Sequence, residues 1–228
     1  MALLKWDETS KRKYEIGTKK GVLYVMNNDG SYGTGVEWNG LTAVTESNSG
    51  AEETALWADD IKYASLRSAE EFGATIEAYQ CPKEFYVCDG SAELGSGTGV
   101  FVNQQGRRSF GFSYVTTMGN DVEGTDYGYK IHIIYGATAS PSERAYQTIN
   151  DSPDAITLSW EVTTTPIEVP GLKPTSHLII DSTLITAAKL KAIEDLLYGT
   201  DPVSGGAEGS DPTLPTPTRI KQILESNG

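Results

Sequence analysis

The run Ile156-Thr-Leu158-Ser-Trp160-Glu-Val162-Thr163 decides the fold class of this chain. Its even positions are apolar, and its odd positions carry hydroxyl groups or a charge. Since side chains alternate between the two faces of a β-strand, the run predicts a strand with one face in a core and the other in water. Further strands are expected between Gly21 and Asp181, at residues 22–26, 36–45, 72–78, 110–114, 127–135 and 178–180. The domain is therefore predicted to be mainly β.

Residues that favour tight turns separate the predicted strands. These stretches are Asn28-Asp-Gly30, Asn39-Gly40, Cys88-Asp-Gly90, Gly95-Ser-Gly-Thr-Gly99, Gly119-Asn-Asp121 and Asn150-Asp-Ser-Pro153. Parallel strands need a long crossover, usually a helix, and the middle of the chain has no helical periodicity. We therefore expect antiparallel sheets in one main domain, because all-β sandwiches and barrels commonly reach the 228 residues of this chain.

One segment, residues 187–198, has the period of an amphipathic α-helix. Leu190, Ile193 and Leu197 share one face, and charged residues occupy the other. Thr186 can cap its start, and Gly199 suits its end. We expect this helix to lie against the flank of the sheet and to bury its apolar face.

The two ends of the chain are predicted to differ from the β domain at residues 21–200. Residues 1–20, which carry short basic runs, are expected to form an N-terminal arm. Residues 201–212 are rich in Gly, Ser and Pro and predict a flexible linker. A short C-terminal helix follows, with Ile220, Ile223 and Leu224 on one face. This helix can pack on its own domain or on a neighbour.

The composition excludes several classes of function. The chain has 31 acidic and 18 basic residues, a formal net charge of −13, which argues against tight binding of nucleic acid. It has neither a membrane-length apolar stretch nor the apolar segment of a signal peptide, so we expect synthesis in a cytosol and no membrane partner. The spacing of the two cysteines, Cys81 and Cys88, matches no zinc or redox motif and predicts free thiols.

No residue pattern predicts an active site. Neither His132 nor His177 has a second imidazole or a cysteine at ligand spacing in the sequence, which predicts no metal site and no catalytic base. The glycine-rich residues 95–99 lack the Lys-Ser/Thr of a phosphate loop and predict a turn. The acidic residues 121–126 lack the spacing of an EF-hand and predict a hairpin. The protein is therefore expected to be no enzyme and to hold no cofactor.

The stretch Ser47–Asp60 is predicted to be a long, irregular, acidic loop with an aromatic tip. Such a loop is a candidate contact surface, although it could instead fold over its own Trp57. Trp6 in the N-terminal arm is a second candidate. The residues expected to contact a neighbouring subunit or ring are Trp6, Glu52, Glu53, Leu56, Trp57, Asp59 and Asp60.

Several runs together resemble the major tail proteins of siphophages and related prophages of Gram-positive bacteria. The resemblance extends in the same order from about Lys5 to Gly199, and no single run suffices for it. The runs are Gly-Val-Glu-Trp-Asn-Gly-Leu-Thr-Ala-Val (35–44), Ala-Asp-Asp-Ile-Lys-Tyr (58–63), Ser-Ala-Glu-Glu-Phe-Gly-Ala-Thr-Ile-Glu-Ala-Tyr (68–79), Gly-Asn-Asp-Val-Glu-Gly-Thr-Asp-Tyr-Gly-Tyr-Lys (119–130) and Ser-Trp-Glu-Val-Thr-Thr-Thr-Pro (159–166).

The resemblance implies a β-sandwich with a flanking helix, assembled into hexameric rings whose inner sheets join as one barrel. The rings stack into a tail tube, and double-stranded DNA passes through it without specific binding. The implied partners are further copies of the chain and the tape-measure, tail-terminator and distal tail or baseplate proteins. The implied location is the virion tail, assembled in the host bacterial cytoplasm.

Three alternatives stay open at this point. One is a tube subunit of a tail-like bacteriocin or contractile injection system, which shares the ring-forming β-fold. Another is a monomeric β-sandwich that binds carbohydrate or a cell surface. The last is a hydrolase with paired carboxylates, for which Glu77, Glu93 and Glu161 are candidates.

Overall fold

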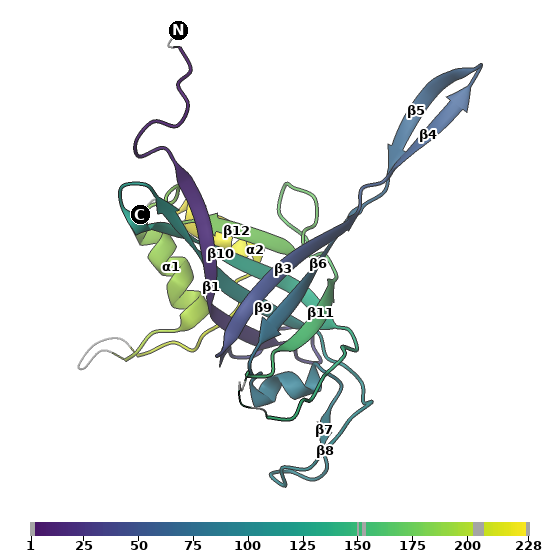
Figure 1. Ribbon diagram of the computed structural model, residues 1–228, viewed down its shortest axis with the longest axis vertical. Coiled ribbons are helices and arrows are strands. Elements are labelled where there is room, and N and C mark those ends of the chain that lie inside the picture. Colours follow the sequence, from purple (N-terminus) through teal and green to yellow (C-terminus); the bar gives the residue numbers. More distant parts are fainter. Residues whose placement is uncertain (1–2, 150, 152–153, 203–207, 227–228) are drawn as a thin grey trace.

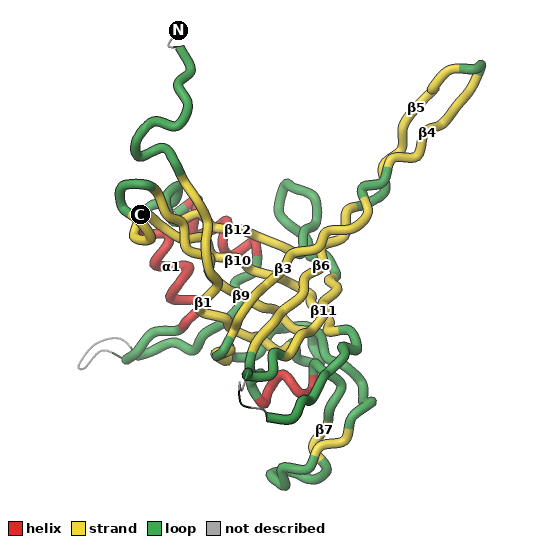
Figure 2. Tube along the Cα trace, viewed as in Figure 1, coloured by secondary structure: helices red, strands yellow, loops and turns green. Residues whose placement is uncertain are grey.

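The structure, a computed structural model, describes residues 3–149, 151, 154–202 and 208–226 and is mainly β (Figures 1 and 2). Its main sheet is eight-stranded, with the order β2-β1-β9-β10-β11-β6-β3 and with β12 paired to β10. All the pairings in it are antiparallel, as the sequence predicted. No helix of the described residues is long and apolar enough to cross a membrane.

The strands of the main sheet are β1 (Lys13–Val25), β2 (Val36–Trp38), β3 (Leu41–Gly50), β6 (Glu70–Ala78), β9 (Phe110–Asn120), β10 (Gly124–Ala139), β11 (Leu158–Thr164) and β12 (His177–Asp181). Two separate hairpins are formed by β4 (Glu53–Ala58) with β5 (Ile61–Arg67) and by β7 (Ala92–Glu93) with β8 (Phe101–Val102). The helices are the short 3-10 helix η1 (Lys83–Val87), α1 (Ala187–Tyr198) and α2 (Pro217–Glu225).

The main sheet folds over itself at Gly136. β10 pairs with β12 before this residue and with β11 after it. Gly136 has a φ of +59°, and a Cβ there would clash with the carbonyl oxygen of Thr165. The turn at residues 39–40 joins β2 and β3, which lie at opposite ends of the strand order, so the sheet nearly closes like a barrel. A first core fills it, with Trp38, Phe112 and Trp160 among its buried side chains.

The two helices cover the outer face of β1, β9, β10 and β12 and enclose a second core (Figure 1). Leu190, Ile193 and Leu197 of α1 are buried there, which confirms the predicted face of this helix. Ile220 of α2 is buried in the same core, so the C-terminal helix packs on its own chain. Of the predicted linker, residues 203–207 lie outside the described residues, and Thr200 and Ser210 on either side form a β-bridge.

The N-terminal arm predicted for residues 1–20 is too long. β1 begins at Lys13 and pairs with β9 along its whole length, so residues 13–20 belong to the sheet. The pairing is irregular between Ile16 and Thr18 and between Lys19 and Val22. Each irregularity shifts the register and breaks the period-two alternation, which is why the pattern did not reveal the strand.

The irregular loop predicted for residues 47–60 is also wrong. β3 runs on to Gly50, β4 follows, and Asp59 and Asp60 form a tight turn into β5. Both aspartates have positive φ, 51° and 59°, as a type I′ hairpin turn requires. The segment is therefore a long hairpin that projects far from the body of the molecule (Figure 2).

Candidate contact surface and histidine cluster

The hairpin β4–β5 carries large apolar side chains on a structure that has no core of its own. The exposed side chains are Leu56 (42 %), Trp57 (70 %), Ile61 (62 %), Tyr63 (73 %) and Leu66 (58 %). An isolated two-stranded hairpin is only marginally stable in water, and a contiguous exposed apolar patch marks an interaction site. The hairpin is thus the leading candidate for a contact with another molecule.

The register shows that the hairpin has two unlike faces. Thr54 pairs with Leu66, Leu56 with Ala64, and Ala58 with Ile61, and paired residues share a face. This apolar face is defined by Leu56, Ile61 and Leu66. The pairing shifts by one residue between Leu56 and Trp57. Because of this shift, Ile61 and Leu66 lie on the same face although they are five residues apart.

The opposite, polar face holds the hairpin together. Glu53 binds Lys62 and the hydroxyl of Ser65, and Arg67 lies 3.8 Å from its second oxygen. The hydrogen bonds from Lys62 and Ser65 hold the pKa of Glu53 below its ordinary value. Glu53 therefore serves the hairpin itself, and Trp57, paired with Lys62, lies on this polar face.

The remaining predicted contact residues divide between the tip, the base and the N-terminal segment. Asp59 and Asp60 form the turn at the tip. The backbone N–H of Glu52 donates to the hydroxyl of Ser68 at the base. Trp6 is exposed, and its segment projects from the same end of the molecule as the hairpin but lies apart from it (Figure 1). Ile61 and Leu66 were not predicted as contact residues. They are five residues apart in the sequence and share a face only because the pairing shifts between them.

The carboxylates considered for a hydrolase are divided between the main sheet and the separate hairpin β7–β8. Glu77 and Glu161 lie on adjacent strands, diagonally across the β6–β11 pair, because Glu77 pairs with Ser159. Glu93 lies on the separate hairpin β7–β8, where its carboxylate accepts a hydrogen bond from the backbone of Gly99. Such backbone hydrogen bonds lower the pKa of Glu93, which therefore closes the glycine-rich turn.

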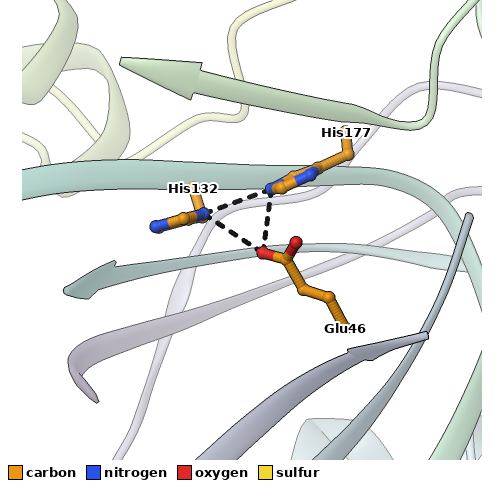
Figure 3. Close-up of side chains that lie close together, drawn as sticks. All are labelled: Glu46, His132 and His177. Atoms are coloured by element: carbon orange, nitrogen blue, oxygen red, sulfur yellow. Dashed lines mark hydrogen bonds and ion pairs between the residues drawn. The ribbon is translucent and has the colours of Figure 1, made fainter. Parts of the chain in front are cut away.

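The structure brings together the two histidines that the sequence leaves apart (Figure 3). His132 Nδ1 lies 3.2 Å from His177 Nε2, and Glu46 Oε1 lies 3.4 Å and 3.5 Å from these two nitrogens. Neither histidine has a second imidazole at ligand spacing in the sequence, but the fold places each beside the other in space. His132 is opposite Ile179 on β12, so His177 is its diagonal neighbour on the same face of the sheet.

Aromatic rings and burial define the surroundings of this histidine cluster, Glu46, His132 and His177. Tyr114 stacks on the His132 ring and Phe72 on the His177 ring, each with centroids 4.5 Å apart. Tyr114 also donates its hydroxyl hydrogen to Glu46 Oε1, at 2.7 Å. Burial lowers the pKa of both imidazoles, although the charge of Glu46 opposes the shift. Burial therefore favours the neutral form of both rings.

Comparisons with known proteins leave the family of the chain undecided. No family model matches the sequence, and a search of curated proteins finds no significantly similar chain.

Proposed function

We propose that the protein is a structural subunit of a phage tail, which forms hexameric rings that stack into a hollow tube. The resemblance in the ordered sequence runs and an antiparallel β-fold with a flanking helix support this proposal. The observation that carries it is the projecting hairpin β4–β5, whose apolar face of Leu56, Ile61 and Leu66 is uncovered.

A second copy of the chain is the partner that this geometry favours. The hairpin projects away from its own body, so its apolar face must be covered by another molecule (Figure 1). A contact between a projecting hairpin and the body of the next copy joins two different surfaces. Repeated contacts of this kind give a closed ring or an open stack, according to the rotation between copies. A tube of stacked rings contains both kinds of contact, closed rings around the axis and an open stack along it.

Strand pairing offers a second contact between copies. β3 lies at one end of the strand order, and among the described strands it pairs only with β6. The part of this edge that does not approach β1 is a template for another strand. In the proposed ring the edge of β3 pairs with a neighbouring copy, which removes the exposed edge and joins the sheets around the lumen.

The charge of the chain suits a channel for double-stranded DNA. A net charge of −13 makes binding of phosphates unfavourable, so a lumen that carries part of this charge lets DNA slide. Tape-measure, tail-terminator and distal tail proteins are the partners that a tube of this kind requires at its centre and ends.

Negative-stain electron microscopy at high and at low protein concentration tests the proposal. We expect rings or hollow tubes at high concentration, and sedimentation velocity should show their dissociation on dilution. Monodisperse monomers at every concentration, together with binding of a carbohydrate or a cell surface, would contradict the proposal and favour a binding module. Tubes from native particles that never contain a genome would instead identify a tail-like particle.

A further inference from the structure

We propose that Glu46, His132 and His177 form a binding site for a divalent transition-metal ion, with Zn²⁺ as the best fit. The ion would join β3, which carries Glu46, to β10 and β12, which carry the histidines. This inference is independent of the proposed function, since it concerns a single copy of the chain.

The spacing of the ligand atoms is that of a tetrahedral site. Zn²⁺ binds histidine nitrogen and carboxylate oxygen at about 2.0–2.2 Å, which places neighbouring ligand atoms about 3.3–3.5 Å apart in a tetrahedron. The three edges of the triangle formed by His132 Nδ1, His177 Nε2 and Glu46 Oε1 are 3.2, 3.4 and 3.5 Å. The side chains point toward one another, so an ion over this triangle needs little rearrangement (Figure 3).

The hydrogen bonds around His132 favour the tautomer that a metal ion requires. Thr116 donates its hydroxyl hydrogen to Glu15, so its oxygen is left to accept the N–H of His132 Nε2, 3.0 Å away. A neutral imidazole has one N–H, so Nδ1 keeps its lone pair and directs it into the cluster. A ligand histidine held through its other nitrogen in this way is typical of metal sites.

Other neighbours fix the two remaining ligands. The hydroxyl of Tyr114 binds Glu46 Oε1, which orients the carboxylate toward the histidines. Phe72 stacks on His177 and restricts its ring. The two histidine side chains are only 7 % and 12 % exposed, whereas that of Glu46 is 37 % exposed, so the cluster is open on one side. Two histidines and one glutamate leave a fourth position of the ion for water or for a group from another molecule.

The position of Glu46 gives the ion a structural consequence. β3 continues from Glu46 to Gly50 and then into the projecting hairpin. An ion held by Glu46 and both histidines would fix the root of the hairpin to the opposite half of the folded sheet. The alternative is a hydrogen bond in which His177 Nε2–H donates to His132 Nδ1 with no ion, and the two arrangements differ in metal affinity.

The test is a calorimetric titration of tag-free, full-length protein with Zn²⁺ after treatment with EDTA. We expect saturable binding of one ion per chain. We also expect the visible absorption of four-coordinate cobalt when Co²⁺ replaces Zn²⁺. Glu46→Gln should weaken the binding at least about tenfold. His177→Asn should abolish it, while Glu71→Gln, a change of an exposed glutamate on β6, should leave it unaltered.

The titration distinguishes a metal site from a hydrogen-bonded pair of histidines without an ion. Absence of saturable binding by the wild-type protein would overturn the proposal, and so would binding that Glu46→Gln and His177→Asn leave unchanged. Circular dichroism checks that each variant is folded. If His177→Asn does not fold, the affinity of Glu46→Gln for Zn²⁺ is the deciding measurement. Glu46 is partly exposed, and Gln keeps its shape and the hydrogen bond from Tyr114. Tube formation is not part of the readout, so failure here leaves the proposed function untouched.

Discussion

Removing the apolar face of the hairpin should prevent assembly without unfolding the subunit. The variant Leu56→Ala/Ile61→Ala/Leu66→Ala truncates the side chains that define this face. They are between 42 % and 62 % exposed in the single chain, so little core contact is lost. Substitutions at exposed positions usually change the free energy of unfolding by no more than about 0.5 kcal/mol each. The melting temperature of the dilute variant should therefore stay close to that of the wild type.

The expected loss of association follows from the exposed area. Full burial of a Leu or Ile side chain is worth roughly 1.5–3 kcal/mol, so covering these half-exposed side chains contributes about 1 kcal/mol each beyond Ala. The triple variant loses about 3 kcal/mol per contact, and about 1.4 kcal/mol is a factor of ten, so the association constant should fall by about 150-fold.

Sedimentation velocity over a dilution series measures this shift, and electron microscopy shows whether rings or tubes persist. The matched control is Tyr146→Ala/Leu172→Ala, which removes exposed apolar side chains outside the hairpin. We expect the control to assemble like the wild type. If the triple variant forms tubes at the same concentration as the wild type, the hairpin is not the contact surface and the reasoning fails.

Further predictions concern the cores, the histidines and the thiols. Ile193→Ala should lower the free energy of unfolding by about 2–5 kcal/mol in a urea titration, because the buried side chain joins α1 to the sheet; a change under about 1 kcal/mol would contradict this packing. In the EDTA-treated, metal-free protein, burial lowers the pKa of His132 and His177, so the unfolded chain takes up protons first as pH falls. The free energy of unfolding should be highest above about pH 6.5 and should decline below it, and the decline should be smaller in His177→Asn. Urea titrations at several pH values measure this, and an equal decline in both proteins would refute it. Burial raises the pKa of Cys81 to about 11 and of Cys88 to about 12, so iodoacetamide at pH 8 should modify both thiols only after unfolding, as mass spectrometry can show.

The sequence was a good guide wherever one face of an element is buried and the other is wet. The alternation in residues 156–163 and the period of residues 187–198 report this contrast directly, and β11 and α1 lie there. The pattern failed for the hairpin β4–β5, because its two faces are both in water in the single chain. Its irregular pairing also breaks the period-two alternation, because Ile61 and Leu66 share a face although they are an odd number of residues apart.

The histidine cluster could not be predicted from the sequence, for a different reason. His132 and His177 are brought together by the pairing of β12 with β10, and Glu46 reaches them only because the sheet folds over itself. Strand pairing is a non-local choice, and the predicted strands at 127–135 and 178–180 had no predicted register. Ligand spacing along the chain therefore said nothing about ligand spacing in space.

The direction of the hairpin is set at its base, and this bears on how it could bind. Gly50, the last residue of β3, has a φ of +79°, and Ala51 follows with 53°; a Cβ at Gly50 would clash with the carbonyl of Ala69, which directly precedes β6. On the same strands Asn48 donates a hydrogen bond to Glu70, at 2.8 Å. Close backbone approach and side-chain pairing thus orient the hairpin before any partner arrives. Because a preoriented segment loses less conformational entropy on binding, a modest apolar face suffices for association when many identical contacts repeat along a tube.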